Sequence, residues 1–151
     1  MIRKFLYLYQ QKRLLKSKNP NALKTFDKNK TIFFHIPKTG GNSIYESLFE
    51  KEQWGHRDVA YYRFVFGKKK FDSYFKFCFV RNPYDRLYSA YCFLKKGGMN
   101  QGDEDFNSSY LSEYNSFEDF IVKGLHKAEI INWIHFKPQY TFIQNKKGKL
   151  E

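Results

Sequence analysis

The pattern of hydrophobic positions is clearest between residues 31 and 49, where its period changes once. An apolar, β-prone run over residues 32–36 favours a strand. A polar turn that contains two glycines follows over residues 37–43. The apolar positions of residues 44–49 then recur at a helical spacing and would form one face of a helix. The sequence therefore predicts a strand, a tight turn and a helix in direct succession.

A second apolar segment repeats this order over residues 75–95. Its aromatic run over residues 75–80 suits a buried strand, which Asn82-Pro83 ends. Proline is acceptable in the first turn of a helix. The helix that would follow carries its apolar residues on one face, namely Leu87, Tyr91 and Leu94. Gly97-Gly98 would end this helix, because glycine readily adopts the left-handed conformation of a C-cap.

The remaining segments carry weaker patterns. We expect an N-terminal helix and a polar connector over residues 1–30, followed by one domain over residues 31–151. Residues 67–70 are interpreted as a charged turn. Residues 99–115 lack periodicity, so they are interpreted as a long loop of the kind that often forms lids or binding loops.

The turn over residues 37–43 has the composition of an anion site. Successive backbone N–H groups converge in a glycine-rich turn, and a helix N-terminus favours negative charge. Lys38 adds a full positive charge. The usual nucleoside-triphosphate loop places its lysine after the glycines, whereas Lys38 precedes Gly40 and Gly41 here. The order therefore favours binding of a phosphate-like group but fits an ATPase or a kinase poorly.

This order of residues resembles the 5′-phosphosulfate-binding loop of sulfotransferases that use 3′-phosphoadenosine 5′-phosphosulfate (PAPS). The resemblance implies that Lys38 and the rest of the loop hold the phosphosulfate; the other loop residues are Thr39, Gly40, Gly41, Asn42 and Ser43. The segment RNPYDRLYSAY, residues 81–91, resembles the family's 3′-phosphate-binding motif. By the same resemblance, Arg81 and Ser89 would contact the 3′-phosphate. Both motifs are spelled as in the carbohydrate-modifying branch.

The resemblance also implies a fold and a reaction. The fold would be an α/β, three-layer, P-loop-like arrangement with a central parallel β-sheet flanked by helices. The reaction would move the sulfuryl group from PAPS to a hydroxyl of a carbohydrate and release 3′-phosphoadenosine 5′-phosphate (PAP), without a metal. Lys38 would stabilise the charge on the leaving phosphate. A P-loop kinase-like protein and a non-catalytic nucleotide-binding fragment remain as alternatives.

The general base of this reaction would be a histidine or a glutamate. His56 lies between the two motifs and resembles the glycine-histidine of the uronosyl 2-O-sulfotransferase-like branch, in which that histidine is the base. Other branches use a glutamate shortly after the first loop, so Glu46 and Glu50 are alternatives. A lone histidine is more often structural than catalytic. His35 fits that description, and we expect it to be packed or bonded to backbone.

Near its end the chain resembles the family once more. Residues 135–143 are similar to an H-x-x-P-Q element, which makes His135 a candidate for shaping the acceptor site. In relatives this element is followed by another strand and further helices. We therefore expect either a truncated sequence or an unusually small member, and the activity of these residues alone is an open question.

The composition adds one point about partners. With 27 Lys and Arg against 15 Asp and Glu, the formal net charge is +12, and 17 Phe with 12 Tyr supply bulky rings for a core. A field of this sign attracts polyanions, which suits the PAPS donor and an anionic glycan acceptor. It would also suit nucleic acid, but no zinc-finger spacing, RNP-like motif or helix-turn-helix signature supports that interpretation.

The N-terminal segment and the cysteines bear on localisation. The apolar run of residues 5–9 is too short to span a bilayer. The segment could form a basic amphipathic helix at a membrane surface, but a helix packed on the domain is the simpler expectation. Two cysteines without ligand spacing favour a reducing compartment. We therefore expect a cytoplasmic enzyme of bacterial type, with a membrane-associated or Golgi enzyme lacking its anchor as the alternative.

Overall fold

The computed structural model describes residues 2–49 and 55–151, which divide into two compact units. The first unit spans Met1–Val80 and Gln139–Glu151, and the second spans Arg81–Pro138. The predicted N-terminal segment, residues 1–30, belongs to the first unit. Each unit has its own hydrophobic core, so each is described by itself.

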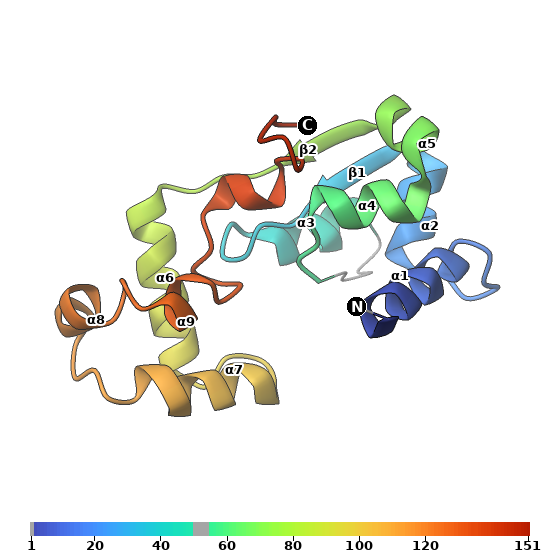
Figure 1. The fold of residues 1–151 in the computed structure, drawn as a ribbon. Helices are drawn as coiled ribbons and strands as arrows, with labels where there is room; N and C mark the ends of the chain where they lie inside the picture. The colour runs from blue at the N-terminus through green and yellow to red at the C-terminus, as the bar shows by residue number, and fades with distance from the viewer. Residues whose placement is uncertain (1, 50–54) are drawn as a thin grey trace. The chain divides into compact units, whose positions relative to one another are not determined.

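The first unit contains the predicted parallel strands. Its elements in chain order are α1 (Ile2–Leu14), α2 (Ala22–Asn29), β1 (Thr31–Phe34), α3 (Gly41–Leu48), α4 (Val59–Phe66), α5 (Lys68–Ser73), β2 (Phe75–Cys78) and the 3-10 helix η2 (Gln139–Phe142). The strands β1 and β2 lie side by side in parallel, with Thr31 opposite Phe75 and Phe34 opposite Cys78 (Figure 1). The fold is thus a mixture of helices and a small parallel sheet, as an α/β protein requires.

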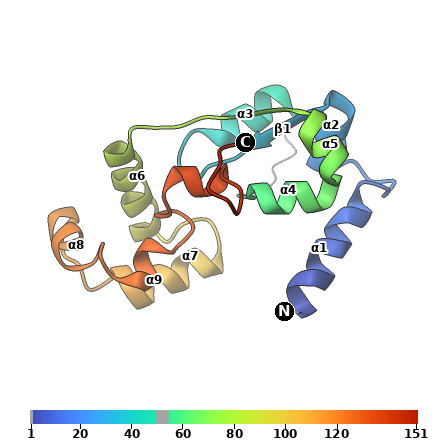
Figure 2. The ribbon, with the colours of Figure 1, turned by 45° about the horizontal axis from the view of Figure 1, so that its top comes forward.

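Aromatic rings fill the core of the first unit, as the composition indicated. The ring of Phe33 lies at its centre, with ring centroids 5.3 Å from Tyr45, 6.2 Å from Phe49 and 5.1 Å from Phe77. The helices of this unit pack on the sheet and on one another: α2 packs on β1, α4 packs on α5, and α1 packs on α4 (Figure 2). The N-terminal helix is therefore packed on its unit, which confirms the simpler of the two expectations for it.

Three expectations about the first unit were wrong. The polar connector contains α2, whose start is capped by Asn21 and whose buried residues are Ala22, Leu23 and Phe26. Residues 68–70 belong to the helix α5, not to a turn, because Phe71 anchors this helix in the core. The second strand ends at Cys78 and is only partly buried: Phe75 is 67% exposed, and the other strand residues are half-buried. Within the described residues β2 pairs with β1 alone, so its other edge has no strand partner there.

The second unit is helical. Its elements are α6 (Pro83–Lys95), α7 (Gln101–Phe106), the π-helix η1 (Asn107–Leu111), α8 (Phe117–Lys123) and α9 (Ala128–Ile131). The predicted helix α6 is confirmed at both ends. The side chain of Asn82 accepts hydrogen bonds from the N–H groups of Tyr84 and Asp85, and Gly97 and Gly98 follow the helix with φ of 92° and 71°.

The long loop expected over residues 99–115 is instead α7 and η1. Asn100 caps α7 by accepting from Asp103 N, and the Asp103 carboxylate accepts in return from Asn100 Nδ2. This reciprocal pair satisfies donors at the helix start. Phe106 and Leu111 then bury themselves in the core of the second unit. The segment shows no helical period because only a few of its positions face that core.

A largely exposed ion pair joins α5 to α2 in the first unit. Lys70 Nζ donates to both carboxylate oxygens of Asp27, at 2.7 and 2.9 Å, and the Tyr74 hydroxyl donates to the same group. Burial alone would raise the pKa of Asp27, but these hydrogen bonds outweigh it and lower the pKa below its ordinary value. A carboxyl with a lowered pKa stabilises the fold above its unfolded pKa, and this stabilisation is lost as the pH falls through the folded pKa.

We therefore expect Asp27→Asn to lower the free energy of unfolding by about 1 kcal/mol at pH 7. The difference from the wild type should shrink as the pH falls through the lowered pKa of Asp27, because the carboxyl is then protonated and loses its charge. Urea unfolding at several pH values measures it, and a double-mutant cycle with Lys70→Met isolates the pair. A difference that stays constant between pH 3 and pH 7 would show that the charge on Asp27 is not the cause.

Candidate functional site

The turn between β1 and α3 has the backbone geometry of a ligand-binding loop. Lys38 adopts a positive φ of 66°, which L-residues other than glycine rarely do, and Gly40 follows with φ of 83°. The Thr39 hydroxyl donates to the carbonyl of Ile36 at 2.8 Å, and this hydrogen bond within the turn stabilises its conformation. Since this bond uses the Thr39 hydroxyl proton, the loop offers a ligand its main-chain N–H groups and the Lys38 ammonium.

The start of α3 completes this loop. Gly40 is the N-cap residue and makes no side-chain hydrogen bond to the helix. The N–H groups of the first helical turn have no partner within their own helix, and here they belong to Gly41, Asn42 and Ser43, of which the last two are exposed. A helix start of this kind is a favourable anion site. The structure thus brings all of the predicted loop residues, 38–43, together around one helix N-terminus.

Gly41 is required by the side chain beneath the loop. A Cβ atom at this position would lie 1.9 Å from Cδ2 and 2.0 Å from Nε2 of His35, which no real contact allows. The His35 imidazole is only 8% exposed and stacks on Phe33, with ring centroids 5.8 Å apart. His35 is therefore packed, as expected, and it lies directly against the first residue of α3.

His56 lies against His35, although the two residues are 21 positions apart in the chain. Its Nδ1 lies 3.0 Å from the main-chain oxygen of His35, and the two imidazole centroids are 4.3 Å apart. His56 is half-buried. The predicted base thus lies beside the residue that begins the turn to Lys38. The alternative base Glu46 is exposed on α3, and Glu50 lies outside the described residues.

The second motif belongs to the second unit. Arg81 is exposed just before α6, and Ser89 is half-buried two turns into that helix. Arg86, of the same motif, is buried instead: its Nη1 donates to the carbonyl of Lys137 at 2.9 Å, and burial lowers its pKa to about 10. Arg86 is thus an anchor for the loop that ends at Pro138, whereas the arginine that precedes α6, Arg81, is exposed.

His135 has a structural contact that the sequence did not reveal. Its Nε2 lies 3.3 Å from Oδ1 of Asp103, and both side chains are buried. The Asp103 carboxylate also accepts a hydrogen bond from Nδ2 of Asn100, the N-cap residue of α7, so one carboxylate joins the helix start to the H-x-x-P-Q element. The sequence signal for the helix start was the spacing of Asn100 and Asp103, which is that of a capping pair. Gly98 makes the approach possible, because a Cβ there would lie 2.1 Å from Asp103 Cβ.

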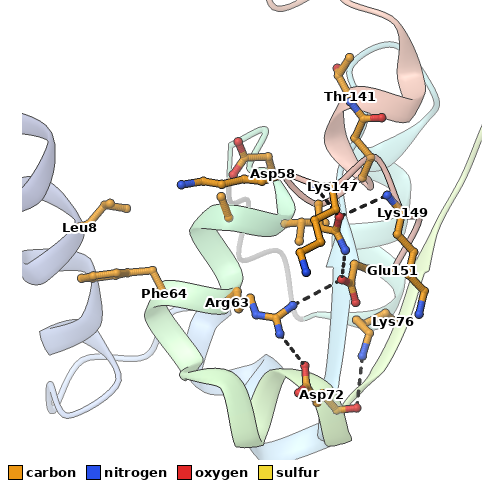
Figure 3. A pocket seen from close by; sticks show the side chains of 15 residues that line it. Leu8, Asp58, Arg63, Phe64, Asp72, Lys76, Thr141, Lys147, Lys149 and Glu151 are labelled. Carbon is orange, nitrogen blue, oxygen red and sulfur yellow. Dashed lines mark hydrogen bonds and ion pairs between the residues drawn. The ribbon is translucent and has the colours of Figure 1, made fainter.

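The first unit also contains a cavity of about 1130 Å³ beside α4 (Figure 3). Arg63 projects into it and pairs with Glu151 at 3.4 Å and with Asp72 at 3.6 Å. Its other charged lining residues are Asp58, Lys76, Lys146, Lys147 and Lys149. Cationic side chains therefore outnumber acidic ones around this cavity.

The described residues, 2–49 and 55–151, contain neither a candidate metal site nor a membrane-spanning helix. No group of three or more His, Cys, Asp or Glu side chains in them could hold a metal ion. Among the helices they form, none combines the length and the apolar character needed to cross a membrane.

Comparison with known proteins identifies the family. A sequence profile described as "Sulfotransferase family" matches residues 21–151, which include both motifs and His56. The chain belongs to the sulfotransferase family. Within this sulfotransferase-family chain, 78 residues are 36% identical to an uncharacterized protein of Archaeoglobus fulgidus. That alignment covers 50% of the chain and 48% of the archaeal protein, so the chain spans about half the length of this curated relative. No solved structure matches this family member.

Proposed function

We propose that this sulfotransferase-family chain transfers the sulfuryl group of PAPS to a hydroxyl of a carbohydrate and releases PAP. The observation that carries the proposal is the loop over residues 38–43. It joins a lysine in a left-handed conformation to a helix start without a side-chain cap, in a chain that matches the family over residues 21–151. In fold, we propose the three-layer, P-loop-like arrangement, with β1 and β2 in its central parallel sheet.

The chemistry of the loop suits the donor half of the reaction. The bond between sulfur and the bridging oxygen of PAPS breaks, and negative charge develops on the 5′-phosphate of PAP. The Lys38 ammonium and the main-chain N–H groups at the start of α3 are fixed donors for that charge, so they need little reorganisation as it forms. The new bond joins sulfur to the acceptor oxygen, and His56 takes the proton of the acceptor hydroxyl.

The remaining parts of the proposal concern the 3′-phosphate and the acceptor. Arg81 and Ser89 bind the 3′-phosphate, as the motif resemblance implies. An anionic glycan is the acceptor, and the branch is the uronosyl 2-O-sulfotransferase-like one, which the glycine-histidine at His56 resembles. The net charge of +12 and the cationic lining of the cavity support that choice. Because α1 packs on α4 with only part of its surface, peripheral membrane association through its exposed face is a further proposal, supported by Leu6 and Tyr9, each 55% exposed.

Calorimetry with nucleotides tests the proposed donor. PAP should bind equally well in EDTA and in magnesium, and more tightly than ATP under both conditions. A kinase-like protein would instead bind ATP with magnesium at least as well as PAP. If PAP binds but no glycan of a sulfated and uronate-containing panel accepts sulfate, the chain is a nucleotide-binding module, and the transfer step of the proposal is wrong.

Arg81→Ala tests the assignment of the 3′-phosphate. A charge-assisted hydrogen bond to phosphate is worth about 1.5–3 kcal/mol, so PAP affinity should fall by about 10- to 100-fold. Adenosine 5′-phosphate lacks the 3′-phosphate, so its affinity should not change. Lys96→Ala removes the same charge from the other end of α6 and serves as the control. Equal losses for PAP and for adenosine 5′-phosphate would contradict the assignment.

A further inference from the structure

The hydrogen bond of His56 fixes which of its ring nitrogens carries the proton. Nδ1 lies 3.0 Å from the main-chain oxygen of His35. A carbonyl oxygen can only accept, so Nδ1 must be the donor in this bond. Neutral His56 is then the Nδ1–H tautomer, and its Nε2 carries the lone pair. Nε2 is therefore the nitrogen that can accept a proton, which is the arrangement that a general base needs.

The side chain of His35 restrains the same ring from a second direction. Its imidazole contacts the His56 imidazole at a centroid distance of 4.3 Å, with the ring planes inclined by 59°. It has little room to move, because it stacks on Phe33, meets the edge of Tyr45 at 5.4 Å and lies against Gly41. A rigid, buried ring thus touches both His56 and the first residue of the donor-binding helix.

We propose that His35 is the positioning residue of His56. Its main-chain carbonyl selects the Nδ1–H tautomer, and its imidazole holds the plane of the His56 ring while resting on Gly41 at the start of α3. The position of the base is thereby coupled to the loop that holds the donor. The catalytic meaning of this arrangement rests on the proposed function, whereas the tautomer and the ring position do not.

The tautomer can be measured without donor or acceptor. Long-range ¹H–¹⁵N correlation spectra of the protein with ¹⁵N-labelled histidine report which nitrogen is protonated in each of the four histidines. We expect His56 to show protonated Nδ1 and unprotonated Nε2 at a pH where the ring is neutral. His126, which is exposed, should show the averaged signals of a mobile ring and serves as the internal reference. A protonated Nε2 on His56, or signals averaged like those of His126, would overturn the proposal.

Three substitutions and a control test the role of the ring. His35→Ala keeps the main-chain carbonyl but removes the restraint, so the His56 signals should average, and turnover should fall about 10- to 100-fold at unchanged donor KM. His35→Phe should recover most of both, because it restores a flat ring. Gly41→Ala forces the His35 ring aside and should disturb the His56 signals although residue 35 is still a histidine. Gly55→Ala adds the same methyl group where no described atom other than those of its chain neighbours lies within 4 Å, and it should leave the spectrum unchanged.

The outcomes separate this proposal from the proposed function. If His56 signals in His35→Ala and Gly41→Ala match those of the wild type, His35 does not position His56, whatever the protein binds. If the wild-type tautomer and its response to both substitutions are as expected but PAP does not bind, the positioning holds and the proposed donor is wrong. Should His35→Ala fail to fold, the spectra of the wild type and of Gly41→Ala still show whether His35 positions His56.

Discussion

Lys38→Ala should abolish sulfuryl transfer, with turnover at least about 100-fold below that of the wild type. The reason is the charge that develops on the departing 5′-phosphate when the sulfur–oxygen bond breaks. Lys38 is the cation of the loop that leads into α3, and the main-chain N–H groups alone cannot supply a full charge. Because this charge is largest in the transition state, the loss should fall on kcat more than on the affinity for PAP.

The backbone of Lys38 supplies a matched control. Its φ of 66° is costly for any residue with a Cβ atom but not for glycine. Lys38→Ala keeps that cost, whereas Lys38→Gly relieves it and should be about 0.5–1 kcal/mol more stable than Lys38→Ala. Both variants lack the ammonium, so both should be inactive.

Turnover assays with labelled PAPS, PAP calorimetry and urea unfolding of the three proteins together measure this prediction. If activity followed stability and returned in Lys38→Gly, the lysine would matter for the fold of the loop rather than for its charge. Turnover of Lys38→Ala above a tenth of the wild-type value would equally contradict the role of Lys38.

The elements that carry the two motifs could be predicted from the sequence, because each combines a hydrophobic period with a distinct end signal. The strand before the loop is apolar, and glycines mark the start of α3. Asn82 and Pro83 mark the start of α6 in the same way. These local signals agree with the tertiary structure, so the hydrophobic period and the end signals together were sufficient to predict these elements.

The missed helices show where that reasoning fails. In α2, α5 and α7 only one turn or two face a core, so a few buried residues hold a segment that is otherwise polar. Their stability comes from caps and from distant partners, such as the contact of Lys70 with Asp27, 43 positions away. A pairing over that distance leaves no pattern in the local sequence. The exposure of β2 escaped prediction for the same reason, since it depends on which strands pair.

The candidate site likewise has one part that local sequence predicts and one part that it does not. The anion loop could be read from residue order, because its function depends on neighbouring main-chain groups. The contact between His35 and His56 could not, because it joins residues 21 positions apart and depends on a main-chain carbonyl that every residue has. The sequence suggested His56 through a family resemblance, and the structure adds a physical reason for its orientation.

His56→Ala should reduce turnover by about 100- to 10,000-fold, which is the usual contribution of a general base. The affinity for PAP should stay within about twofold of the wild-type value, because His56 acts on the acceptor proton and not on the donor. Added imidazole should restore part of the activity, since a small base can enter the space that the side chain leaves. A purely structural histidine would not give this rescue.

Three control variants make the assignment of the base decisive. His126→Ala removes an exposed histidine and should have no effect on turnover. Glu46→Gln and Glu50→Gln test the alternative bases, and neither should approach the loss seen for His56→Ala. If His56→Ala turned over at a near-normal rate while one of the glutamine variants lost activity, that glutamate would be the base. The Nδ1–H tautomer of His56 would then serve packing beneath the loop and not proton transfer.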